Sequence, residues 1–466
     1  MSPVSRSRKP KRPAHHPVRT APASPFAPLL EDAAELAAQT DPLAAEMWAS
    51  SVLGMLFVSA WNQAVEEAEG HHHEHDHGDD DDHVHEGVDP DELFETNLNA
   101  LFDYLASQRK PAALAALRAL GAVGEEWTRG EALDAAESLA ERGVKEPAWL
   151  GNAVEPEPSG IVAIGDEFGE RRLISLAFTR GTETHVLTAQ VVHTMAPDLI
   201  TLSLHNGFDE EELRAGYVES TGLQPVDLDL AEARIRLEDA LEILLSHEPV
   251  DLPEDLGDDE DLEFSDPKQL WPLLAVRLEL LPQDDAAEDR VYDNATAEPA
   301  AQVRAAVEAF LASPRAADLP DREFAGQFVT VLADEAVVSE RGPYGFGPLG
   351  LAVCLEGETV SHLTFTDQQL DQVGPVATAW AHFTADARNL SAAAHEAWDE
   401  QLPELTEAFR ELYLDPESVA HRAECPDVIP VEKFEPGATA TDEDLAENLA
   451  RLLAEATGNS LEPDTD

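Results

Sequence analysis

Residues 171–205 read RRLISLAFTRGTETHVLTAQVVHTMAPDLITLSLH, and their alternation points to a β-sheet. The pattern is most regular near the end, where Ile200, Leu202 and Leu204 are separated by polar residues. Such alternation is typical of a strand with one buried face. We expect strands over 171–178, 184–192 and 198–205. Because short connections join antiparallel neighbours, the stretch predicts an antiparallel meander of three or four strands.

Helical patterns flank this meander on both sides. Asp41-Pro42 and Asp89-Pro90 are start signals, because Asp caps a first turn and Pro suits the first helical position. The predicted helices before the meander cover 29–39, 41–68, 89–105, 111–120 and 128–142, and those after it cover 229–246 and 268–280. The sequence therefore predicts an α+β fold with a helical N-terminal part and an antiparallel β-meander packed with helices.

The C-terminal part predicts a smaller α+β unit. We expect helices over 301–311, 321–332, 367–387 and 390–413, and a hairpin of 351–355 with 359–365 across Gly357. The loop before it, Gly345-Phe-Gly-Pro-Leu-Gly350, matches the G-x-G-x-x-G pattern of dinucleotide sites. Such a site needs a helix directly after the loop. Since a strand is expected there, we interpret the loop as a turn that enters the hairpin.

Six segments follow from these patterns, with disordered tails and acidic loops between the structured parts. They are a disordered basic arm over 1–25, a helical region over 26–150 with a His/Asp-rich loop at 69–88, a meander domain over 151–282, an acidic linker over 283–299, a C-terminal α+β domain over 300–435, and a tail over 436–466 with one amphipathic helix.

The chain carries 94 acidic against 30 basic residues, a formal charge of −64. A body this acidic repels nucleic-acid phosphates and anionic membrane surfaces. With 43% hydrophobic residues it is nevertheless too apolar to be mainly disordered. We therefore expect a protein partner, no membrane, and no nucleic acid except through the basic arm. The cations of that arm include Arg6, Arg8, Lys9, Lys11 and Arg12.

Two cysteines and the N-terminal sequence predict a cytoplasmic protein. Cys354 and Cys425 form no CxxC motif, and lone thiols suit a reducing compartment. The basic start lacks the apolar run of a secretory signal. The most hydrophobic stretch, 47–61, is shorter than a membrane span, so we interpret it as part of a core helix.

The tract HHHEHDHGDDDDHVH at 71–85 holds seven His and six acidic residues. Imidazoles bind divalent transition metals such as Zn²⁺ or Ni²⁺, and carboxylates add weaker oxygen ligands. Protons compete for the same nitrogens, so affinity should fall on mild acidification. The alternative interpretation is a low-complexity insertion that keeps a loop soluble. The predicted metal ligands are His71, His72, His73, His75, His77, His83, His85, Asp79 and Asp81.

Residues 73–77 also match the metalloprotease pattern H-E-x-x-H, but no apolar helix is expected there to hold both His on one face. An enzyme-like alternative lies in the meander. If the strands pair as neighbours, His185, His193 and His205, with Asp166 and Asp198, could meet in a catalytic or metal pocket. The competing interpretation places them on the solvent face of the sheet.

Three phrases of the sequence carry a resemblance: PAALAALRALGAVG at 111–124, the loop 342–350 continuing into LGLAVCLEG, and VATAWAHFTA at 376–385. In these phrases the chain is similar to an uncharacterised acidic protein group of high-GC actinobacteria. The resemblance implies a cytosolic protein and supplies no functional residues.

The function that these features favour is a cytoplasmic, non-enzymatic binding or regulatory protein whose His/Asp-rich loop binds divalent transition metal. The alternative is a metal-dependent enzyme, such as a hydrolase, that uses the meander histidines. A third hypothesis is an acidic mimic of nucleic acid that occupies basic proteins.

Overall fold

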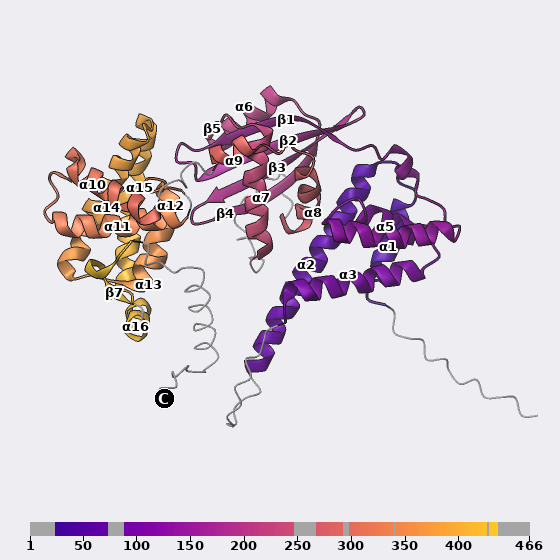
Figure 1. Cartoon of the computed structure of the whole chain (residues 1–466), viewed down its shortest axis with the longest axis horizontal. Coiled ribbons are helices and arrows are strands. Elements are labelled where there is room, and N and C mark those ends of the chain that lie inside the picture. Colours follow the sequence, from indigo (N-terminus) through magenta and orange to yellow (C-terminus); the bar gives the residue numbers. More distant parts are fainter. Residues whose placement is uncertain are drawn as a thin grey trace, which may run out of the picture.

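The computed structural model describes residues 24–72, 88–246, 267–291, 298–339, 341–425 and 428–436. Figure 1 shows three groups of elements along the long axis: N-terminal helices, a sheet with its helices, and C-terminal helices. The α+β class predicted from the sequence is confirmed.

Five helices form the N-terminal group, as the sequence predicted. Asp89 caps the third of them by accepting the amide of Asp91 at 2.9 Å, and Asp41 accepts the amide of Leu43 at 2.9 Å. The helices are α1 (Ala27–Leu36), α2 (Pro42–His72), α3 (Pro90–Ser107), α4 (Pro111–Leu120) and α5 (Glu126–Glu141). Eight of the ten residues of α4 are buried, so this helix forms the centre of the group.

Helix α2 is longer and more apolar than its hydrophobic centre suggested. By length and composition alone, its Pro42–Glu67 section could cross a membrane. Half of the residues in its most apolar 18-residue stretch are nevertheless buried inside the protein. Helix α8 (Pro267–Leu278) packs across it so closely that a Cβ on Gly54 would lie 2.0 Å from the carbonyl oxygen of Lys268. Such packing is that of a core helix.

The predicted antiparallel meander is confirmed as a five-stranded sheet of order β4-β3-β2-β1-β5. The register shifts between Gln190 and Val191, which pair with Thr201 and Leu199, so Ile200 is an extra residue on β4. This bulge overturns the expectation that Ile200 shares the buried face of Leu202. The strands are β1 (Glu157–Gly165), β2 (Arg171–Arg180), β3 (Glu183–His193), β4 (Pro197–Asn206) and β5 (Gln224–Pro225).

Helices cover both faces of the sheet. Tyr217 of α6 (Glu210–Thr221) packs on one face with Val162 and Ile164. The other face, which includes Leu176 and Phe178, is covered by α7 (Leu230–Ser246) and α8. This second face shares one hydrophobic core with the N-terminal helices, so the predicted division at residue 150 separates types of secondary structure within a common core.

The C-terminal group has a core of its own, but its predicted hairpin is wrong. Residues 348–362 are helical throughout, with one π-helical turn at Leu355–Thr359. The only sheet among the described C-terminal residues pairs two two-residue strands, β6 (Leu363–Thr364) and β7 (Ile429–Pro430), in parallel. The helices are α10 (Pro299–Ala312), α11 (Arg322–Val338), α12 (Pro348–Cys354), α13 (Val360–His362), α14 (Asp367–Ala387), α15 (Ala392–Leu414) and α16 (Pro416–Glu424), after the short α9 (Asp285–Val291) in the predicted linker.

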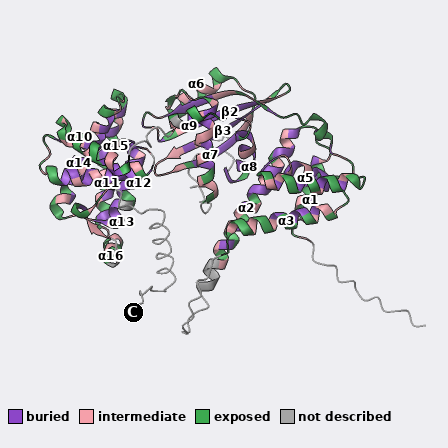
Figure 2. Cartoon of the chain, in the orientation of Figure 1, coloured by how far each residue is buried: buried purple, intermediate pink, exposed green. Residues whose placement is uncertain are grey.

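The turn between β1 and β2 connects the sheet to this second core. Phe168 lies in the turn, is 8% exposed, and belongs to the C-terminal core rather than the sheet's. Its ring packs edge-on against Trp398 of α15, with centroids 5.5 Å apart. Figure 2 shows buried residues inside each group of elements. The contact at Phe168 places the C-terminal helices at one end of the sheet.

Candidate functional site

The three meander histidines lie in three different environments and do not meet. His185 and His193 are eight residues apart on β3, which separates them by roughly 26 Å at the rise of a strand. His205 lies on β4, and its Nε2 is 2.9 Å from Oγ1 of Thr188 on the α6 side of the sheet. The predicted convergence of these histidines is therefore not found.

His185 belongs to a buried ion-pair cluster that links α2, α8 and the sheet. Its Nε2 accepts a hydrogen bond from Nε of Arg277 at 3.1 Å. Arg277 and Arg180 each contact one carboxylate oxygen of Glu46 at 2.5 Å. Burial, with the two arginines nearby, lowers the pKa of His185 to about 3. His185 is thus a neutral acceptor that helps hold the core together.

His205 also serves a buried polar network. Beside the Thr188 contact, its Nε2 lies 3.4 Å from the hydroxyl of Tyr217, which in turn lies 3.1 Å from Oγ1 of Thr188. Burial lowers the pKa of His205. This network joins α6 to the sheet.

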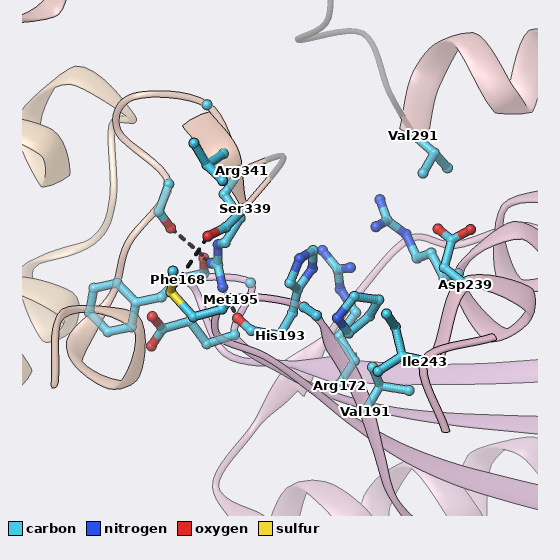
Figure 3. A pocket seen from close by; sticks show the side chains of 18 of the residues that line it. Phe168, Arg172, Val191, His193, Met195, Asp239, Ile243, Val291, Ser339 and Arg341 are labelled. Carbon is cyan, nitrogen blue, oxygen red and sulfur yellow. Dashed lines mark hydrogen bonds between the residues drawn. The ribbon is translucent and has the colours of Figure 1, made fainter. Parts of the chain in front are cut away.

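Of the three histidines, His193 lines the cavity that we name the Arg172 pocket. The cavity measures about 820 Å³ and lies between the sheet, α7 and the segment that connects α11 to α12. Figure 3 shows Arg172 and His193 rising from the sheet, with Ser339 and Arg341 on one side and Asp239 and Ile243 on the other. The same cavity is lined by Ile174 and Val191, by Met195 to Pro197, and by Arg236 and Arg388.

The alternation of β2 brings Arg172 to the floor of this pocket. Arg172 pairs with Val191, and Ile174 pairs with Ala189, so their side chains share one face of the sheet. On the same face, further along β2, Leu176 and Phe178 belong to the core beneath α7 and α8. The floor of the pocket is therefore the polar end of an otherwise buried sheet face.

Within the described part of the chain, the guanidinium of Arg172 donates no hydrogen bond, although the residue is only partly exposed. Burial, with the charges of Arg236 and Arg341, lowers its pKa to about 10. Arg172 remains charged near neutral pH. A desolvated guanidinium without a hydrogen-bond acceptor is a recognised host for an anion.

His193 adds a neutral imidazole to the floor. Burial lowers its pKa to about 4, helped by the charges of Arg341 and Arg172. A hydrogen bond with the backbone of Ser339 opposes this shift without reversing it. At neutral pH the imidazole therefore offers hydrogen bonds and no charge.

Two further arginines of the pocket rim hold its walls together. Arg341 donates to the carbonyl oxygens of His193, Phe168 and Gly345, the last two at 2.9 and 2.8 Å. Arg388 also donates to the carbonyl oxygen of Phe168, at 2.9 Å. Their hydrogen bonds are committed to backbone, so we assign them a structural role. Arg236, which also lines the pocket, is not free either, whereas Arg172 donates no hydrogen bond within the described residues.

The loop 345–350 runs into helix α12, which begins at Pro348, contrary to the predicted turn into a strand, and its amides already have an acceptor. Glu170, in the turn between β1 and β2, accepts hydrogen bonds from the amides of Gly347 and Gly350 at 2.7 Å and from that of Leu349 at 2.9 Å. The site where a dinucleotide phosphate would bind is filled by a carboxylate of the protein itself. The G-x-G-x-x-G match thus marks an internal contact.

The residues predicted to bind metal fall largely outside the described part. His71 and His72 form the last residues of α2. The remaining predicted ligands, His73, His75, His77, Asp79, Asp81, His83 and His85, lie outside the described residues, as do Arg6, Arg8, Lys9, Lys11 and Arg12 of the basic arm. In the described ranges, no group of three or more His, Cys, Asp or Glu is arranged to hold a metal ion.

Sequence reasoning pointed to His193 but missed Arg172. The alternation of the strand could have revealed it. Arg172 lies two, four and six residues before Ile174, Leu176 and Phe178, so it shares their face of the strand, whereas Arg171 lies on the other face. An arginine on the apolar face of a strand, in a chain with few cations, marks a site. The pocket also depends on segments more than a hundred residues further along the chain, such as that at Ser339.

No family model, no curated protein and no solved structure matches this chain.

Proposed function

We propose that this chain is a non-enzymatic, cytoplasmic binding protein whose Arg172 pocket takes a small molecule with an anionic head and an apolar body. The observation that carries the proposal is the guanidinium of Arg172, which lines a cavity of about 820 Å³ and donates no hydrogen bond within the described residues. A cavity of this size is typical of small-molecule sites.

The chemistry of the pocket suits such a ligand. A carboxylate or phosphate can accept two parallel hydrogen bonds from one guanidinium, which fixes its orientation. His193 stands beside Arg172 and supplies a neutral partner (Figure 3). The apolar body would contact Ile174 and Val191 on the floor and Ile243 on α7. Burial of such a body adds affinity in proportion to its apolar area.

A pair of neighbouring variants tests this proposal. Arg171 precedes Arg172, is exposed, and points to the opposite face of the sheet. We expect a panel of small carboxylates and phosphate esters to contain compounds that raise the melting temperature of the wild type and of Arg171→Gln alike. The same compounds should leave Arg172→Gln unchanged. If the same compounds raise the melting temperature of Arg172→Gln as much as that of the wild type, or if no compound stabilises the wild type, the proposal is wrong.

Metal binding by the tract at 71–85 is a second, separable proposal, favoured by its seven histidines. We propose that this tract binds Zn²⁺ or Ni²⁺ at several interchangeable sites of moderate affinity. Titration of either metal into the chain with and without residues 71–85 measures the contribution of the tract. Equal metal uptake by the two forms would contradict it.

The other two functions are weaker proposals. A metal-dependent hydrolase that uses the meander histidines would require His185, His193 and His205 to act together, and they occupy separate surroundings. An enzyme of that kind should lose a tightly bound metal in His193→Ala. An acidic mimic of nucleic acid should instead bind a DNA- or RNA-binding protein in low salt.

A further inference from the structure

A second pair of histidines lies far along the chain, where α14 packs against α15. Nδ1 of His382 and Nδ1 of His395 are 2.9 Å apart, and the two rings are nearly parallel, with an interplanar angle of 12°. Both side chains are partly accessible, at 12% and 25% exposure. An ion from solution can therefore reach them.

Each histidine also has a carboxylate beside its other ring nitrogen. Nε2 of His382 is 3.0 Å from Oδ1 of Asp399, and Nε2 of His395 is 3.4 Å from Oδ1 of Asp386. The second oxygen of Asp386 accepts from Nε of Arg315 at 2.9 Å. The five side chains form one continuous row across α14, α15 and the turn at Pro314–Ala316.

The two histidines make two hydrogen bonds in this row, one between the Nδ1 atoms and one from Nε2 of His382 to Asp399. One N–H on each imidazole is enough for both of them. Nε2 of His395 lies at ion-pair distance from Asp386. If a metal ion replaces the proton between the Nδ1 atoms, each Nε2 carries its proton towards a carboxylate.

We propose that His382 and His395 bind one divalent transition-metal ion of the Zn²⁺ class through their Nδ1 atoms. In metal sites a ligating histidine almost always donates its other N–H to a carboxylate or carbonyl. Asp399 and Asp386 stand where that role requires them. The metal takes the place of the shared proton between the rings, and water completes its coordination.

Metal binding requires both rings to turn. Two nitrogens bound to one tetrahedral Zn²⁺ at about 2.0–2.1 Å lie roughly 3.3 Å apart. The Nδ1 atoms are now 2.9 Å apart and face each other along the line between the ring centroids, which are 5.2 Å apart. The rings must therefore rotate so that both lone pairs point at one ion. With two protein ligands the site should be of moderate affinity, and the proposal is independent of both the tract at 71–85 and the Arg172 pocket.

Nitrogen NMR of the full chain labelled with ¹⁵N-histidine separates this site from the others. We expect Zn²⁺ to shift two Nδ1 resonances that are absent, or no longer shifted, in His382→Gln and His395→Gln. The control is His421→Gln, because His421 is an exposed histidine on α16 away from the pair. That variant should retain both shifts.

Asp399→Asn tests the role of the carboxylate without removing a metal ligand. We expect the two Nδ1 shifts to require about 10-fold more Zn²⁺ in this variant. Near-UV circular dichroism, sensitive to Trp380 and Trp398 on the same helices, checks that each variant is folded. If saturating Zn²⁺ leaves the two resonances of the wild type unshifted, the pair holds only a proton and the proposal is wrong.

Discussion

The carboxylate of Glu170 lies 2.7 Å from the amide nitrogen of Gly350, although the two residues are 180 positions apart in the chain. The same carboxylate accepts the amides of Gly347 and Leu349. Both glycines are required by this approach, because a Cβ would lie 2.6 Å from the carboxylate at position 347 and 2.9 Å at position 350. Glu170 thus caps α12 from the sheet.

We predict that Glu170→Gln destabilises the protein by about 2 kcal/mol. The glutamine amide presents an N–H group where a second acceptor oxygen is needed, and hydrogen bonds to a charged group contribute about 1.5–3 kcal/mol each. Urea unfolding measures the change. The control is Glu308→Gln on the exposed side of α10, which should change the free energy of unfolding by less than about 0.5 kcal/mol. Equal stability of the two variants would show that the cap is dispensable.

This contact also explains why the sequence misled at 351–365. Gly357 between Leu351–Leu355 and Thr359–Phe365 looks like a hairpin turn flanked by β-branched residues. The helix forms because Pro348 occupies its first turn and Glu170 accepts the free amides there. The capping group lies outside any local window, so no periodicity in residues 345–365 could reveal it.

Elsewhere local signals were sufficient. Asp41 and Asp89 mark helix starts because the capping side chain is adjacent to the amide that it accepts. The strands of the meander were predictable because alternation is local too. The pocket could not be predicted in this way, because its floor comes from β2 and β3 while Ser339 and Arg341 come from the C-terminal part.

In the absence of a ligand, the partly buried charge of Arg172 should lower the free energy of unfolding. Its guanidinium is desolvated and close to other arginines, as its lowered pKa reflects. We predict that Arg172→Met raises the free energy of unfolding by about 1 kcal/mol while it abolishes the binding of anionic ligands. Urea unfolding without ligand measures the first effect. Arg171→Met, at an exposed position on the opposite face of the sheet, should change neither property. A destabilised Arg172→Met would mean that Arg172 is a structural residue.

Gly54 should not tolerate a side chain. A Cβ there would lie 2.0 Å from the backbone oxygen of Lys268, so Gly54→Ala must push α8 away from α2. We expect a loss of about 1–3 kcal/mol, typical of overpacking. The matched control is Gly130→Ala on α5, where a Cβ meets nothing within 4 Å and alanine favours the helix. Thermal unfolding should move in opposite directions for the two variants, and a shift of the same sign would contradict this packing.

The buried cluster around His185 should make the protein sensitive to mild acid. His185 is 3% exposed and has a pKa of about 3 in the folded state against 6.5 for an ordinary histidine. The unfolded chain therefore binds the proton first as the pH falls. The stability that the neutral His185 contributes is complete above pH 6.5 and is lost progressively towards pH 3.

Between pH 7 and pH 5 this linkage amounts to about 2 kcal/mol for His185 alone. We predict that His185→Gln, which keeps an acceptor for Arg277 but does not titrate, reduces the difference in unfolding free energy between the two pH values by about that amount. Urea unfolding at pH 7 and pH 5 measures it. His421→Gln is the control, because His421 is exposed on α16 and its replacement should leave the pH dependence as in the wild type. If His185→Gln keeps the full pH dependence, the acid sensitivity arises from other groups and His185 is not held neutral by its surroundings.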